Sequence, residues 1–198
     1  MALTKVSRGL LTTSIVDNGN ATAITIDASE NVGVGNTSPS SYFSNARNLV
    51  VGGTTGANGM TISGSTDTQI FFADGTSGAD AYRGIIRYSH VDDGFSFWTN
   101  ATRVLDIDSA GSVGIATIPK SGWATDAVQL GTNLSLSEDA NSAYLSANAY
   151  NSSGGWKRVN NQLAGYIRMG TNDGVFSFSN AVTGAADSVI TWQERFSI

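Results

Sequence analysis

The sequence predicts an all-β protein made of two tandem, β-sandwich-like repeat units, and a repeated stretch of residues is the first reason. Residues 23–37 read AITIDASENVGVGNT, and residues 104–117 read VLDIDSAGSVGIAT. A shift of 81 residues superposes Ile26 on Ile107. An internal repeat outranks any local motif in predicting a fold.

A second block repeats at the same shift, far downstream of the first. Residues 84–97 read GIIRYSHVDDGFSF, and residues 165–178 read GYIRMGTNDGVFSF. Two separated blocks in one register indicate a duplicated structural unit. We therefore expect one unit at residues 23–103 and a second at residues 104–184, which together form an elongated fibre.

Composition is the third reason. Only 14% of the 198 residues are charged, against about 25% in typical soluble domains, and 23 are glycine. Gly, Ser, Thr and Asn favour many short strands joined by tight turns. Units of this size have marginal cores, so we expect them to bury surface against further copies.

Bulk properties exclude several classes of function. With a net charge of −5 and scattered basic residues, we expect no nucleic-acid partner. The chain has no cysteine, which excludes disulfides, thiol nucleophiles and thiolate metal sites. Its N-terminus lacks an apolar run long enough for a signal or a membrane span, so we expect assembly in a cytoplasm and no membrane insertion.

Residues 1–22 precede the repeat and carry a small apolar group without enough sequence for a core. We interpret them as an anchoring segment, with Leu10, Leu11, Ile15 and Val16 as its contact residues.

Each copy of the first block predicts a β-hairpin. Residues 23–27 alternate apolar and polar side chains at period two, as a half-buried strand does. Residues 32–35 would return beside them, with Gly33 where another backbone approaches. The second copy repeats this plan at 104–108 and 113–115.

Further short segments of each unit predict strands of a sandwich. In the first unit they are 48–51, 60–63, 69–73, 84–89 and 95–99, and in the second 127–130, 134–136, 143–147, 166–169 and 175–179. Residues 185–198 predict a terminal cap strand, with 188–192 opening a third hairpin. Alternating phenylalanines predict core positions: Phe71, Phe72, Phe95, Phe97, Phe176 and Phe178.

The hairpin block carries a resemblance. The stretch ITIDASENVGVGNTSPSS resembles the "ID-x-x-GNVGIGT-x-x-P" linker that recurs in bacteriophage tail fibres and related virion appendage proteins. The C-terminal stretches NAYNSSGGWKRV and ADSVITWQERFSI are similar to the accompanying body domain. The second linker departs from the pattern, because it reads VGIATIP.

This resemblance implies a homotrimer located in the virion, joined through its N-terminus to a tail or capsid protein, with host attachment as its function. Two alternatives stay open. One is a capsid-attached head fibre or decoration protein without a receptor role, and the other is a polysaccharide depolymerase.

Residues for catalysis are sparse, and we predict no catalytic residue, cofactor or metal. His90 is the only histidine and lies in a turn sequence. The duplicated Asp27/Asp108 favours turn capping over chemistry. The stretch from Asp106 opens like a calcium loop, but Ala110 stands where an oxygen ligand is needed. A depolymerase would use paired acids from among Asp92, Asp93, Asp106, Asp108, Asp173, Glu30, Glu138 and Glu194.

One loop suits recognition of a host-surface glycan. Tyr150, Trp156, Lys157 and Arg158 fall outside the predicted strands of the second unit. Aromatic rings stack on sugars, and the cations would pair with acidic groups. These four residues are the candidate receptor contacts, and packing against a neighbouring subunit is the alternative.

Overall fold

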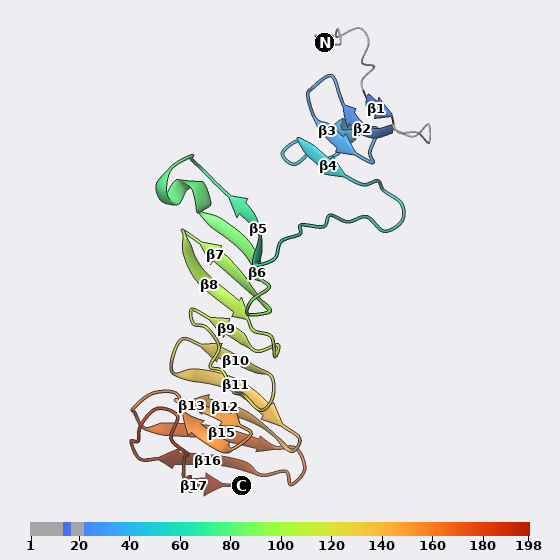
Figure 1. Cartoon of the computed structure of the whole chain (residues 1–198). Helices are drawn as coiled ribbons and strands as arrows, with labels where there is room; N and C mark the ends of the chain where they lie inside the picture. Colours follow the sequence, from blue (N-terminus) through green and yellow to red (C-terminus); the bar gives the residue numbers. More distant parts are fainter. Residues whose placement is uncertain (1–13, 17–21) are drawn as a thin grey trace. The chain divides into compact units, whose positions relative to one another are not determined.

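The computed structural model describes residues 14–16 and 22–198 (Figure 1). The chain divides into two compact units, Met1–Ile62 and Ser63–Ile198. Over the described residues the protein is all-β, as predicted, and its helical segments are the short 3-10 turns η1 (Pro39–Ser41) and η2 (Gly78–Tyr82). Among these residues, none forms a helix with the length and apolar character needed to cross a membrane.

The described part of the first compact unit, Met1–Ile62, is one small sheet. Its strands lie in the order β1 (Ser14–Val16), β2 (Thr22–Ile26), β3 (Val32–Val34) and β4 (Leu49–Val51). β1, β2 and β3 pair antiparallel, whereas β3 and β4 are parallel. The parallel step requires the chain to cross back between β3 and β4, and η1 lies in that connection.

In residues 63–198, all of which are described, eleven strands form a single sheet in the order β17-β16-β15-β12-β11-β10-β9-β8-β7-β6-β5. Figure 1 shows these strands stacked in succession. Only β9 and β10 are parallel. The strands are β5 (Asp67–Phe72), β6 (Gly84–Ser89), β7 (Gly94–Thr99), β8 (Thr102–Ile107), β9 (Val113–Ile115), β10 (Ala127–Leu130), β11 (Leu134–Asp139), β12 (Ser142–Ala147), β15 (Ala164–Gly170), β16 (Phe176–Ala181) and β17 (Gln193–Ser197).

This single sheet replaces the predicted sandwich. With one exception, each strand pairs with the strands next to it in the sequence, so the chain extends one layer and does not fold a second large sheet onto it. The exception is the hairpin of β13 (Ala149–Ser152) and β14 (Gly155–Arg158), which is inserted between β12 and β15.

The two copies of the hairpin block have the same register. Thr25 lies opposite Gly33 in the first copy, and Asp106 lies opposite Gly114 in the second. The strand before each hairpin also matches, because the β1–β2 and β7–β8 pairings both contain an irregularity at the equivalent step. The β6–β7 and β15–β16 pairings also share one register: Ile86 lies opposite Phe97, and their counterparts Ile167 and Phe178 lie opposite each other. The boundaries 23–103 and 104–184 stay a prediction.

The hairpin turns explain the repeated aspartates. The carboxylate of Asp27 accepts hydrogen bonds from the backbone N–H groups of Ser29 and Asn31 (2.8 and 3.0 Å). Asp108 accepts them from Ala110 and Ser112 (3.0 and 2.9 Å). The predicted turn-capping role is therefore confirmed.

The repeated glycines meet a close backbone approach, as predicted. A Cβ on Gly33 would overlap the carbonyl oxygen of Asn36, and a Cβ on Gly114 would overlap that of Thr117. The connection that follows each hairpin passes too close to the strand for any side chain at these positions.

Three local predictions were wrong. Residues 60–63 form no strand. Residues 150–158, expected as a loop, form most of the β13–β14 hairpin. At the C-terminus the strand begins only at Gln193, and 188–192 contribute a single bridge, between Val189 and Lys157.

The predicted anchoring segment lies mostly outside the described residues, and Leu10 and Leu11 are among the residues that are not described. Ile15 and Val16 belong to β1, where Ile15 lies opposite Ile24. Their backbone is thus part of the first sheet.

Candidate functional site

One face of the eleven-stranded sheet carries an uninterrupted series of large apolar residues. Residues directly opposite each other in paired strands lie on the same face. One row runs through Ile70, Ile86, Phe97, Leu105, Ile115, Leu130 and Leu134. A second continues through Leu136, Leu145, Ile167, Phe178 and Phe196. Because Leu134 and Leu136 are two residues apart on β11, both rows lie on one face, which we call the apolar face.

The apolar face is exposed. Leu136 is 48% exposed, Phe178 38% and Phe196 50%. Large apolar side chains in such density are normally buried. The prediction that the alternating phenylalanines are core residues is therefore wrong for the chain by itself, because five of the six are exposed: Phe71, Phe72, Phe95, Phe176 and Phe178.

The four-stranded sheet β1-β2-β3-β4 also carries exposed apolar residues on one face. Ile26 lies opposite Val32, which pairs with Leu49, and Val34 pairs with Val51. Ile26, Val34, Leu49 and Val51 are all exposed. These positions match apolar-face positions of the second sheet through the shared register.

Over β11, β12, β15 and β16, the opposite face of the large sheet is buried although many of its residues are small and polar. Ser146 is 0% exposed, and Ser135, Ser142 and Ser177 are nearly as inaccessible. The Oγ atoms of Ser135 and Ser146 lie 2.8 Å apart, and Ser135 Oγ donates to the Ala149 carbonyl oxygen at 3.0 Å. The hydroxyls of Ser135 and Ser146 are paired, so the burial of these two side chains costs little. We call this the covered face.

The β13–β14 hairpin and the segment after β16 cover this face. Ala149, Ala164, Ala181 and Ile190 form the buried apolar cluster, with Trp156 and Trp192 packed against it. The aromatic rings make edge-on contacts: the ring centroids of Tyr166 and Trp192 lie 4.5 Å apart, and those of Tyr144 and Trp156 4.8 Å apart.

Two of the four predicted receptor contacts are buried in this layer. Tyr150 is 3% exposed and Arg158 5%. The Arg158 guanidinium donates to the carbonyl oxygens of Val182 and Val189 (2.6 and 3.2 Å) and to Ser188 Oγ (3.1 Å). The prediction that both are accessible to a glycan is wrong, because Arg158 ties residues 182–189 to the hairpin. Trp156 and Lys157 are half-buried.

Tyr150 completes a charged contact at the edge of the layer. Its hydroxyl donates to Asp187 Oδ1 at 2.6 Å, and Lys120 Nζ lies 3.0 Å from the same carboxylate. Burial, followed by the hydrogen bond to Asp187, raises the pKa of Tyr150 above its ordinary value of 10. Its hydrogen bond, with that of Lys120, lowers the pKa of Asp187.

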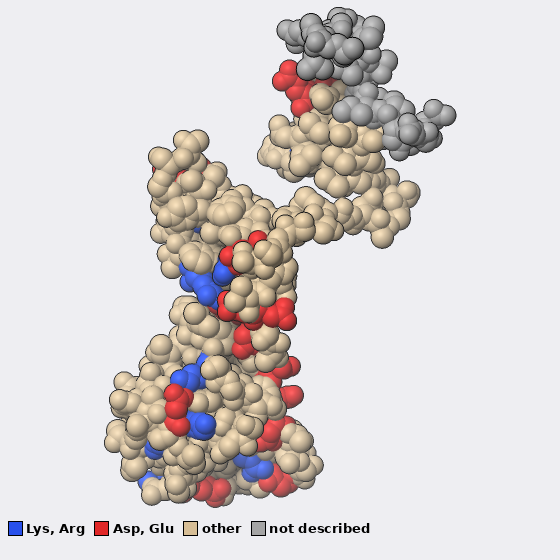
Figure 2. Space-filling view, in the orientation of Figure 1, with Lys and Arg blue, Asp and Glu red and all other residues tan. Residues whose placement is uncertain are grey.

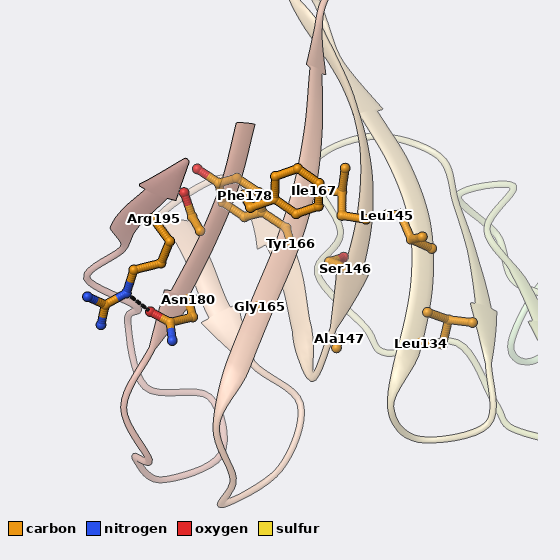
Figure 3. A pocket seen from close by; sticks show the side chains of 11 residues that line it. Leu134, Leu145, Ser146, Ala147, Gly165, Tyr166, Ile167, Phe178, Asn180 and Arg195 are labelled. Atoms are coloured by element: carbon orange, nitrogen blue, oxygen red, sulfur yellow. Dashed lines mark hydrogen bonds between the residues drawn. The ribbon is translucent and has the colours of Figure 1, made fainter. Parts of the chain in front are cut away.

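A shallow hollow of about 330 Å³ opens on the apolar face. Figure 3 shows Phe178, Ile167, Leu145 and Leu134 across neighbouring strands along it, with Arg195 at one end. Arg195 Nε donates to Asn180 Oδ1 at 2.8 Å. The lining of the hollow is nearly all hydrocarbon and contains no Asp, Glu, His, Cys or Lys residue.

A second hollow, of about 380 Å³, brings together three of the acids considered for a depolymerase: Asp92, Asp106 and Asp108. Each already has a structural partner. Asp92 accepts from Ser89 Oγ, Asp106 pairs with Arg103, and Asp108 caps its turn. In the part of the chain that is described, no three His, Cys, Asp or Glu residues are grouped to hold a metal ion, and His90 lies exposed in a turn.

In the view of Figure 2, acidic side chains of residues 63–198 gather along one margin, and most visible Lys and Arg side chains lie away from it. The strand directions place the ends of β6, β8, β11 and β15 on one side of the sheet. Several acids lie at these ends or shortly after them: Asp92, Asp93, Asp108, Asp139 and Asp173.

No family model matches the chain, and comparison with curated proteins and with solved structures gives no significant match. The fold and the site therefore define an all-β protein with an extended apolar sheet face. Sequence reasoning missed this face, although alternations such as Leu-Ser-Leu-Ser at 134–137 carried the signal that the two sides of the sheet differ.

Proposed function

We propose that this chain is the subunit of a homotrimeric virion appendage of a bacteriophage, a tail fibre that mediates host attachment. The observation that carries the self-association is the exposed apolar face, which follows the entire large sheet and recurs on the small one. The phage assignment is supported by the resemblance of the hairpin block to tail-fibre linkers.

Self-association follows from the energetics of this face. Full burial of a Leu, Ile or Phe side chain stabilises by about 1.5–3 kcal/mol relative to full exposure, and many such residues on this face are one-third to one-half exposed. A partner must offer an apolar surface of the same length. A second copy of the chain does so, and copies arranged around an axis close without leaving a copy unpaired. Three is the number that the resemblance implies.

The test has two parts. Light scattering of the purified full chain should give about three times its mass of 20.6 kDa, and a folded, stable monomer would refute the assembly. Antibody labelling of phage particles in the electron microscope should then place the protein at the tail. Label on the capsid would instead favour a head fibre, and unlabelled particles would refute the virion assignment.

A further inference from the structure

The β5 strand forms one end of the large sheet, and its outer edge has no partner among the described strands. Its counterpart in the second half of the sheet is β12. Phe72 lies opposite Gly84 as Ala147 lies opposite Gly165, and the two glycines are a repeat apart. β12, however, pairs on its outer side with β11. The position that β11 fills beside β12 is thus empty beside β5.

The residues that should fill this position can be read from the β11–β12 hairpin. Asp139 lies opposite Ser142 across a two-residue turn, and Ser135 lies opposite Ser146. The same spacing before β5 places Gly64 opposite Asp67 and Met60 opposite Phe71. Residues 60–63 have strand character in the sequence, yet none of the backbone–backbone hydrogen bonds of the described chain involves residues 57–64.

The side chains fit this pairing. In the second half, the Ser135–Ser146 pair is polar and lies beneath the β13–β14 hairpin. The shorter connection between β5 and β6 contains η2 and no hairpin, so nothing covers Phe71, which is 52% exposed. Met60, the counterpart of Ser135, is 61% exposed. Where there is no covering hairpin, the equivalent positions thus carry two apolar residues, Met60 and Phe71, in place of the two serines.

We propose that residues 60–64 of one copy form an added antiparallel strand on the β5 edge of the next copy, with Met60 packed against Phe71. This inference rests on the self-association proposed above. A neighbouring copy is the proposed donor because residues 57–64 take part in none of the backbone–backbone hydrogen bonds of the described chain, and Met60 and Phe71 are both exposed. In a closed ring each copy donates one strand and receives one, and the exchange covers the aggregation-prone β5 edges.

The absence of native cysteine makes a disulfide test direct. Met60→Cys chains and Phe71→Cys chains are produced together and oxidised, so that a link between positions 60 and 71 can form only between copies. We expect a two-chain band on a non-reducing gel and, by mass spectrometry, a disulfide-linked peptide pair that joins position 60 to position 71. Met60→Cys mixed with Phe72→Cys is the matched control, because alternation along β5 places position 72 on the opposite face, and no disulfide-linked peptide pair should join position 60 to position 72.

An assembly of trimeric mass without the 60–71 link would overturn the strand exchange and leave the proposed function intact, whereas a monomeric mass would contradict both. In a chain that carries both Met60→Cys and Phe71→Cys, a disulfide that forms only within one chain would also overturn the strand exchange. Amide hydrogen exchange on the unmodified assembly is the second measurement, independent of how the variants fold. The amides of residues 60–63 should be protected to a degree comparable with those of β11, and rapid exchange there would refute the proposal.

Discussion

The hydroxyls of Ser135 and Ser146 lie 2.8 Å apart under the β13–β14 hairpin, while the next pair along the same two strands, Leu136 and Leu145, lies on the exposed apolar face. Small residues are inside because they leave room for the backbone of the hairpin, whose Ala149 carbonyl oxygen accepts a hydrogen bond from Ser135. Large residues lie on the other face, where many are one-third to one-half exposed and where we propose that neighbouring copies meet.

A charge on the apolar face should disrupt the assembly. We expect Leu136→Glu to shift the protein from about three chain masses toward one, because an unpaired carboxylate buried in the interface costs about 3–5 kcal/mol. Light scattering measures the change. The control is Val91→Glu, at a turn position that is 75% exposed and off the face, which should leave the mass unaltered. Equal behaviour of the two variants would show that the face is not the interface.

Alanine at Gly114 should destabilise the second compact unit, Ser63–Ile198. Its Cβ would overlap the Thr117 carbonyl oxygen and crowd Pro119, so the connection must move, at a cost of about 1–3 kcal/mol. Chemical denaturation with a fluorescence readout measures the loss. Gly53→Ala, where a Cβ would meet nothing within 4 Å, is the control. A Gly114→Ala protein as stable as the control would show that the approach is readily relieved.

Removal of the Arg158 guanidinium should lower stability whether or not a receptor is present. Arg158→Ala leaves the carbonyl oxygens of Val182 and Val189 without their donor and removes a side chain that is only 5% exposed. A hydrogen bond to a charged group contributes about 1.5–3 kcal/mol. We expect a lower melting temperature in calorimetry. Arg195→Ala, at an exposed arginine, should have a much smaller effect. A variant that melts normally but adsorbs poorly to host cells would restore Arg158 as a receptor contact.

Alkaline pH should weaken the fold through Tyr150. Because the folded-state pKa of Tyr150 lies above its ordinary value of 10, the stabilising contribution of its neutral form is complete below pH 10. It is lost as pH rises from there through the native pKa. We expect thermal stability to fall more steeply above about pH 10 in the unmodified protein than in Tyr150→Phe. The exposed Tyr82, changed to Phe, is the control, and parallel profiles for all three proteins would contradict this role.

Local sequence patterns predicted much of the fold. Alternation at 23–27 and 104–108, with an aspartate at the end of each, predicted the hairpins and their turns, because turn capping depends on residues only two to four positions apart. The 81-residue shift anticipated the shared register of these hairpins. The candidate site was not predicted, since the phenylalanines were assigned to a core and Tyr150 and Arg158 to an exposed loop.

What the sequence alone determined is therefore the all-β character, the positions of the two repeated hairpins and the separation of large and small residues onto two faces. Period-two alternation states that the faces differ, but not which one is covered. Only the tertiary structure decided that, because the cover comes from segments distant in the sequence, the β13–β14 hairpin and residues 182–192. Ile190 and Trp192 pack onto the serine- and alanine-bearing face, whereas the apolar face stays exposed in the single chain.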